Sequence, residues 1–243
     1  MKKIILVHWR NVKLPEKINY MENIEEEAFE NIECYMTVPL THLLLARETF
    51  PKFIRLVAPD CIEFDENNEY CSGITIRNLL DIQIKTVILG SAERIFDMNE
   101  TQNIISQKLI CCYKNKLKVI LYLINTKEEY ETDMEAYNLL VQLTKYFSTL
   151  QQNLWNEITV IYEPEWFFIQ DYSYFELRLK NKVAYIKKAL DIYLITAKII
   201  FSGRLNYIFI KKMLEKKIVD GYLYHGEPFD DDFMNIIRFM NKI

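Results

Sequence analysis

The sequence predicts an α/β fold, a closed (β/α)8 barrel formed as a single domain by residues 1–243. Eight short apolar runs recur along the chain, with helical patterns between them. The runs are continuous rather than alternating, which is typical of parallel strands buried on both faces. They recur about every 30 residues, the size of one βα unit. No Pro-, Gly- or Ser-rich linker divides the chain, and the absence of a glycine-rich turn after the first run disfavours an open dinucleotide-binding sheet.

The predicted strands extend over the whole chain and are followed by recognisable helix starts. The strands are residues 4–7, 34–38, 53–58, 86–89, 119–124, 159–162, 198–201 and 221–224. Thr41 precedes the apolar start of an early helix. Thr126 and Glu129 form a capping box before one long amphipathic stretch that ends near residue 150. Three aspartates at 230–232 begin the last helix, where the helix dipole favours carboxylates.

Composition excludes several classes of protein. Half of the residues are hydrophobic and 14% are aromatic, so the chain is not a disordered segment. With 30 Lys and Arg against 34 Asp and Glu, the net charge is −4, which argues against nucleic-acid binding by bulk charge but leaves a local basic patch open. Only five glycines occur, so a glycine-rich phosphate cradle is not expected.

The compartment is predicted from the cysteines and from the N-terminal run. Five cysteines without regular spacing are typical of reduced thiols in a cytosolic protein. The adjacent pair Cys111 and Cys112 lies in an apolar helical stretch and is interpreted as core packing. The first apolar run stops at His8 without a cleavage site, and no window reaches the ~18 uncharged residues of a membrane span. We therefore expect a soluble, cytoplasmic protein with no membrane partner.

In a barrel of this kind, functional side chains follow the carboxyl ends of the strands. Two of the three histidines fall at such positions, after the first and the eighth strands, which are neighbours in a closed barrel. The strand-end residues are His8, Trp9 and Arg10; Pro39 and Thr41; residues 90–94; residues 162–166; Ser202, Gly203 and Arg204; and His225, Gly226 and Glu227.

These strand ends carry motifs of a known family. The clearest are the segments VILGSAER at 87–94 and YEPEW at 162–166. Supporting matches are HWR at 8–10, CSG at 71–73 and DGYL at 220–223. Each motif is weak alone, but all occur in order after the correct strand. The chain therefore resembles the triosephosphate isomerase family, whose fold is the TIM barrel, along its whole length.

The resemblance implies a set of catalytic positions, three of which have changed. In the family a glutamate base moves protons between adjacent carbons while a neutral histidine polarises the carbonyl, a pairing for which this family is itself the standard example. The base aligns with Glu163 and the histidine with Ser91, whose hydroxyl is too short to replace imidazole. The strand-one lysine aligns with Arg10, whose planar fork hydrogen-bonds differently, and the neighbouring asparagine aligns with His8.

The positions implied for phosphate binding have changed as well. The lid after the sixth strand is residues 167–171, which are bulky and lack glycine. Gly203 and Arg204, then His225 and Gly226, are the expected substrate-binding residues for a sugar phosphate. Losing the electrophile, the ammonium and the lid could lower turnover by ~10⁶ if the effects added. We therefore expect a glycolytic-enzyme homologue, pseudoenzyme-like and weak or inactive in aldose–ketose isomerisation.

Two other functions and one structural interpretation stay open. The chain could be a working isomerase for the same or a related sugar phosphate, with Glu163 as base and altered auxiliary groups. His8, Glu163 and His225 could instead form a new acid–base or metal site, since two histidines and a carboxylate suit several metals. Glu163 could also be a structural ion-pair partner of Arg10. For an isomerase, the resemblance implies no cofactor and no metal.

The resemblance also implies a homodimer. The family inserts the loop after strand three into a pocket of its partner subunit, and the corresponding loop here is residues 66–73. Its Ser72 and Gly73 are preserved in kind. The family glutamate that follows is Ile74, so one interface carboxylate, the expected partner of Arg94, is missing.

Overall fold

The computed structural model describes residues 2–9, 24–62, 73–148, 157–165, 171–226 and 228–243. Eight parallel strands form one sheet in the order β3-β2-β1-β8-β7-β6-β5-β4. The two ends of this order meet at Ala58, whose N–H donates to the Thr86 carbonyl and whose carbonyl accepts from Ile88 N–H, both at 2.9 Å. The sheet therefore closes into a barrel. Its strands are β1 (Lys3–His8), β2 (Ile32–Thr37), β3 (Ile54–Val57), β4 (Thr86–Leu89), β5 (Lys118–Asn125), β6 (Glu157–Pro164), β7 (Thr196–Ser202) and β8 (Gly221–Tyr224).

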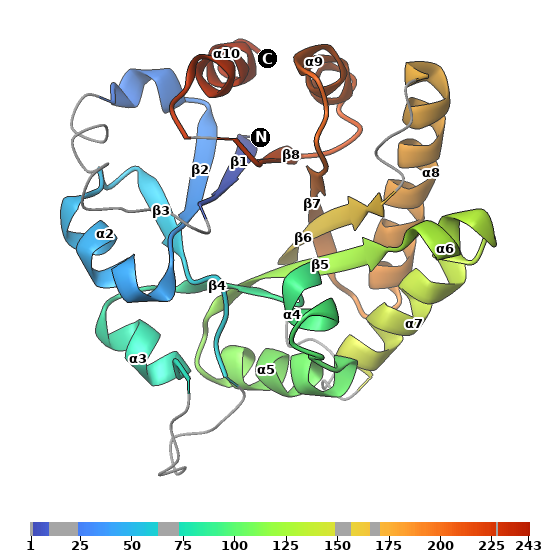
Figure 1. Cartoon of the computed structure of the whole chain (residues 1–243), viewed down its shortest axis with the longest axis horizontal. Helices are drawn as coiled ribbons and strands as arrows, with labels where there is room; N and C mark the ends of the chain where they lie inside the picture. Colours follow the sequence, from blue (N-terminus) through green and yellow to red (C-terminus); the bar gives the residue numbers. More distant parts are fainter. Residues whose placement is uncertain (1, 10–23, 63–72, 149–156, 166–170, 227) are drawn as a thin grey trace.

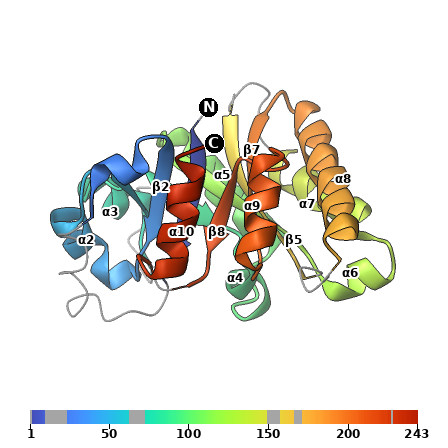
Figure 2. The same ribbon diagram turned by 90° about the horizontal axis from the view of Figure 1, so that it is seen from above.

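Helices cover the outside of the strands, as Figures 1 and 2 show from two directions. The α-helices of the described residues are α2 (Leu43–Thr49), α3 (Ile76–Asp81), α4 (Ala92–Phe96), α5 (Gln102–Lys114), α6 (Lys127–Glu131), α7 (Glu135–Phe147), α8 (Tyr172–Asp191), α9 (Tyr207–Glu215) and α10 (Asp231–Met240). Two 3₁₀ turns, η2 (Glu26–Phe29) and η3 (Leu40–His42), flank β2. This arrangement confirms the predicted (β/α)8 barrel.

All eight predicted strands are confirmed, and 86–89 and 221–224 have the expected bounds. The capping box is confirmed too, because Thr126 accepts from Glu129 N–H while the Glu129 carboxylate accepts from Thr126 N–H. Asp230 accepts from Phe233 N–H at 2.7 Å and so caps α10. Local side-chain chemistry therefore sets these boundaries.

One helix prediction was wrong. The stretch after Thr126 is two helices, because Asp133 adopts a left-handed conformation (φ 57°) that ends α6 and turns the chain into α7. An aspartate tolerates this conformation better than most residues do. Thr41 precedes the early helix as expected. It lies inside η3, where its hydroxyl contacts His42 Nδ1 at 2.9 Å, and α2 starts at Leu43.

The barrel interior has three layers. Its middle layer is apolar and includes Leu6, Ile120, Ile161, Ile200 and Leu223, all at most 2% exposed. Because side chains alternate across a strand, residues two positions before or after these also face inward. Most of these inward positions at the two ends of the barrel are polar or charged, with Ile4 and Gly221 as exceptions, so the two ends can do chemistry that the middle cannot.

A buried charge cluster ties α5 to the loops after β3 and β4. The Lys108 ammonium, 1% exposed, donates to Asp60 at 2.8 Å and also to Glu100. The Arg94 guanidinium lies 3.1 Å from Asp60 and 3.4 Å from Glu100. Against desolvation, Asp60 and Glu100 raise the pKa of Lys108, which keeps it charged. Arg94 therefore has two partners within its own chain.

Candidate active site

Three strands bring one side chain each to the carboxyl end of the barrel. Glu163 is near the end of β6, Ser202 ends β7, and His225 directly follows β8. Each lies two positions after a residue of the apolar middle layer, Ile161, Ile200 and Leu223 respectively. The strand period therefore directs all three side chains towards the barrel axis.

The Ser202 hydroxyl connects the other two groups. It donates a hydrogen bond to Glu163 Oε2, and its oxygen lies 3.0 Å from His225 Nε2. A hydroxyl carries one proton, so the contact with His225 requires Nε2–H to donate to Ser202 Oγ. The order of donation is therefore His225 to Ser202 to Glu163. Ser202 is fully buried, Glu163 is partly buried and His225 is exposed.

His8 lies at the same end but has a different neighbour. It ends β1, and its Nδ1 is 3.5 Å from the hydroxyl of Tyr122, a fully buried residue of β5. At that distance the hydrogen bond is weak. Among the described residues no group of three His, Cys, Asp or Glu side chains is placed to hold a metal ion. The arrangement thus offers His8 a phenol rather than a shared metal site.

Ser91 enters the site from the turn between β4 and α4. Gly90 has φ 74°, a left-handed conformation that glycine adopts without steric penalty and that redirects the chain after the strand. Ser91 is the N-cap residue of α4, but its side chain makes no capping hydrogen bond, and it is 4% exposed. The turn therefore delivers a small, buried hydroxyl to this end of the barrel.

Of the expected binding residues, Arg204, His225 and Gly226 border a cavity of about 420 Å³ that is also lined by residues from the starts of α9 and α10. Its lining includes Arg204, Asn206, Tyr207, Tyr222, Tyr224, His225, Gly226 and Asp232. The Tyr222 hydroxyl donates to the Gly203 carbonyl at 2.7 Å, and burial raises the pKa of Tyr222 to about 12, so the phenol stays protonated. Arg204 is exposed and available to an anion, whereas Asp232 would repel one.

The structure places most of the sequence-predicted site residues at one end of the barrel. The described residues do not include Arg10, Trp166, Glu227, residues 167–170 of the lid or residues 66–72 of the dimer loop. Asp171, counted as part of the lid, instead caps α8 by accepting from Ser173 N–H at 2.8 Å. The sequence places Ser202 among the strand-end residues but predicts no catalytic role for it. Its position two residues after inward-facing Ile200 is the signal that would have found it.

Comparison with known proteins identifies the family of the whole chain. A family model described as triosephosphate isomerase matches residues 3–240. A triosephosphate isomerase of Coprinopsis cinerea is 27% identical over 85% of this chain and 84% of its own length. Those of Mycoplasmoides gallisepticum and Mycoplasma mobile are 24% and 26% identical, over 95% and 98% of this chain and 94% and 99% of theirs.

The similarity thus extends over nearly the whole barrel and includes the strands that carry Glu163, Ser202 and His225. No helix of the described residues is both long enough and apolar enough to cross a bilayer. The chain belongs to the triosephosphate isomerase family.

Proposed function

We propose that this chain is a triosephosphate isomerase homologue in which aldose–ketose isomerisation is weak or lost. The observation that carries the proposal is the hydrogen bond from the Ser202 hydroxyl to the Glu163 carboxylate. Ser202 is in turn hydrogen-bonded to His225 Nε2. A base must present a free lone pair to the proton that it removes. The Ser202 hydroxyl takes a lone pair of Oε2, one of the two carboxylate oxygens, and so competes with a substrate proton at that oxygen.

The second support is the group at position 91. The family reaction needs a donor that polarises the substrate carbonyl while the base acts. A buried serine hydroxyl stands there, and its short side chain limits its reach. Loss of one such donor typically lowers turnover by about 10²–10³. The carboxylate thus has a competing hydrogen bond from Ser202 and lacks its usual electrophilic partner at position 91.

A coupled assay with dihydroxyacetone phosphate and glyceraldehyde 3-phosphate tests the proposal. We expect turnover far below the ~10 per second of an ordinary enzyme. Glu163→Gln should abolish any residual rate, whereas Glu165→Gln, a neighbouring exposed glutamate, should keep it. Ordinary turnover that disappears in Glu163→Gln alone would overturn the proposal.

That outcome would establish the second candidate, a working isomerase with substitute auxiliary groups. The observation that favours it is the inward placement of Glu163 beside Ser202 and His225, two groups that can exchange protons with a bound substrate. Arg204 would then contact the substrate phosphate, since guanidinium binds phosphate through paired hydrogen bonds. Arg204→Ala should in that case raise KM for either triose phosphate more than it lowers kcat.

The proposal includes a cytoplasmic homodimer with residues 66–73 at its interface, which family membership supports. Arg94 does not depend on a glutamate at position 74, because Asp60 and Glu100 neutralise it within the chain. Light scattering should give twice the subunit mass of 29.2 kDa. A subunit mass at micromolar concentration would contradict the dimer.

A further inference from the structure

The amino end of the barrel, opposite the candidate active site, contains two adjoining cavities. The first has a volume of about 730 Å³ and lies under the starts of β2, β3, β5, β6 and β7. The second, of about 590 Å³, lies beside it under β3 and β4. Tyr35, Arg55 and Lys118 line both, so the two cavities form one groove, which we call the basal groove.

The basal groove is strongly basic although the chain as a whole has a net charge of −4. Its acidic side chains are Glu33 and Glu157, both in the first cavity, and none of the described residues that line the second cavity is acidic. Its basic side chains are Arg47, Lys52, Arg55, Lys85, Lys114, Lys116, Lys118 and Lys198. The positive charge of the groove is therefore concentrated and only partly neutralised.

The ion pairs in the groove leave several cations over. Arg55 pairs with Glu33 at 2.8 Å, and Lys198 pairs with Glu157 at 3.0 Å. Within the part of the chain that the structure describes, no ion pair engages Lys85 or Lys118. Lys118 lines both cavities and Lys85 lines the second, and both side chains are exposed. Two ammonium groups at this end of the barrel thus lack an ion-pair partner among the described residues.

Helix ends explain only part of this charge. Arg47 and Lys114 lie in the last turns of α2 and α5, where the helix dipole stabilises a positive charge. Arg55, Lys118 and Lys198 lie on strands instead, two positions before inward-facing Val57, Ile120 and Ile200. By the strand period these three point into the barrel end, away from the surrounding helices.

An aromatic side chain is built into the same wall. The Tyr35 ring, 8% exposed, lies beneath the Arg55 guanidinium, 5.4 Å from its centroid. The Arg55 guanidinium also donates to the Tyr35 hydroxyl at 2.8 Å. Tyr35 therefore holds the guanidinium over the groove, in the way that aromatic faces commonly position cations.

We propose that the basal groove binds a small anion that carries two or more linked phosphates. Each cavity is within the range of volumes of ligand pockets, about 300–1,000 Å³, and both are concave, which suits a compact molecule rather than a nucleic-acid strand. Because the cations are spread over two joined cavities, a chain of phosphates can contact more of them than one phosphate can. Lysine and arginine are the side chains that bind phosphate oxygens best.

Isothermal titration calorimetry with inorganic tripolyphosphate, at about 0.15 M salt, tests the proposal on the full chain. We expect one site per subunit, with affinity that exceeds that for orthophosphate and falls as salt rises. Lys118→Glu should weaken binding about tenfold or more, the effect expected from losing one charge-assisted contact. Lys145→Glu, an equal charge change on the exposed face of α7, should leave the affinity within about twofold, as should Arg204→Ala at the opposite end.

Several outcomes would overturn the proposal. They are an absence of binding by the wild-type chain, equal affinity for orthophosphate and tripolyphosphate, and an equal loss in Lys118→Glu and Lys145→Glu. A loss in Arg204→Ala alone would place the anion at the other end of the barrel. Binding of single-stranded RNA but not of tripolyphosphate would assign the groove to a different ligand. None of these results depends on whether the chain isomerises triose phosphates.

Discussion

At the scale of single residues, one hydroxyl organises the carboxyl end of the barrel. Ser202 is fully buried and contacts a carboxylate and an imidazole that both reach solvent. Water can therefore replace the hydroxyl at Glu163 and His225 more easily than it could in the core. The Ser202 contacts thus position Glu163 and stabilise the native chain only modestly.

Ser202→Ala should lower the free energy of unfolding by about 1 kcal/mol, the usual net value of one hydrogen bond. Urea denaturation measures this change. Ser148→Ala, at the exposed C-terminal end of α7, is the matched control and should leave the midpoint unchanged. Equal midpoints for the two variants would mean that the Ser202 hydroxyl contributes nothing to stability.

Buried cysteines make a second residue-scale prediction, about alkaline pH. Burial raises the pKa of the Cys34 thiol to about 12, whereas the pKa of a thiol in the unfolded chain is about 8.5. Between these values the unfolded chain releases the proton and the native chain keeps it. The free energy of unfolding should therefore fall as pH rises, by up to about 1.4 kcal/mol per pH unit for this group.

Urea midpoints at about pH 8 and about pH 10 measure that dependence. Cys34→Ala, which removes the titrating group, should show a smaller decrease over the same interval than the wild-type chain does. An equal decrease of the midpoint with pH in both chains would contradict the assignment of this pH dependence to Cys34.

The exposure of the thiols predicts their order of chemical modification. In the native state iodoacetamide should modify partly exposed Cys111 before buried Cys34 or Cys112.

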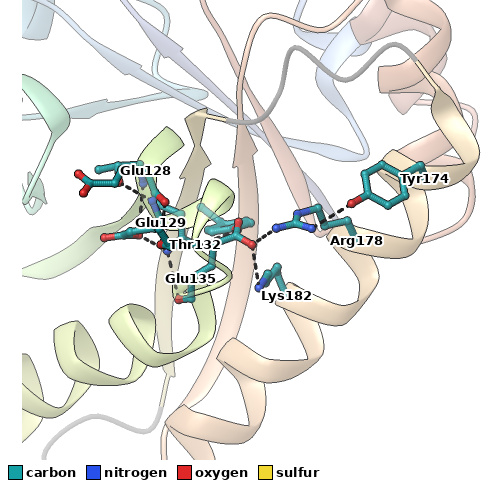
Figure 3. A network of polar contacts seen from close by, with 10 residues as sticks. Glu128, Glu129, Thr132, Glu135, Tyr174, Arg178 and Lys182 are labelled. Carbon is teal, nitrogen blue, oxygen red and sulfur yellow. Dashed lines mark hydrogen bonds and ion pairs between the residues drawn. The ribbon is translucent and has the colours of Figure 1, made fainter.

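At the scale of secondary-structure elements, a buried carboxylate joins two helices. Glu135 begins α7 and is fully buried, and its Oε2 accepts from Arg178 and lies 3.0 Å from Lys182 Nζ, both on α8 (Figure 3). The Arg178 guanidinium also lies over the Tyr130 ring, 4.2 Å from its centroid, at α6. Three consecutive helices are therefore held by one network.

Glu135→Ala should destabilise the chain by about 3 kcal/mol, near the lower limit for breaking a buried ion pair, because Arg178 and Lys182 can reach water. Urea denaturation compares it with Glu128→Ala, which removes an exposed carboxylate on α6 and should cost less than about 0.5 kcal/mol. Similar losses in both variants would show that the network does not join the helices energetically.

At the scale of the whole molecule, the barrel closes unevenly. β5 and β6 share six register pairs from Ile120–Thr159 to Asn125–Pro164, whereas β3 and β4 meet at one bridge. Few hydrogen bonds hold that seam, and regions of this kind open at lower free energy than the core does.

An apolar middle layer separates the two ends of the barrel interior. A ligand bound at one end therefore contacts different side chains from a ligand bound at the other end.

Native-state hydrogen exchange should therefore show less protection for Ala58 and Ile88 amides at the seam than for β5 and β6 amides such as Leu123. Mass spectrometry of deuterated peptides or NMR measures this. Comparable protection around the whole barrel would mean that the closure is as stable as the regular ladders.

The candidate site was predicted from the sequence only in part. Positions such as Glu163 and His225 were found because they directly follow apolar runs, which is local information. The break at Asp133 was missed because an aspartate in a left-handed conformation leaves the helical pattern on both sides unchanged. The catalytic roles of Glu163, Arg10, Ser91 and His8 stay predictions that the assays above test.

By itself the sequence determined the eight strands, the barrel and the family, because apolar runs, caps and motifs are set by residues close together in the chain. Only the tertiary structure decided that the Ser202 hydroxyl donates to Glu163. It also decided that Lys85, Lys118, Lys198 and Arg55 all line the basal groove. The physical reason is that these contacts join different strands. Their distances depend on strand register, on the inward direction of alternate side chains and on closure of the barrel.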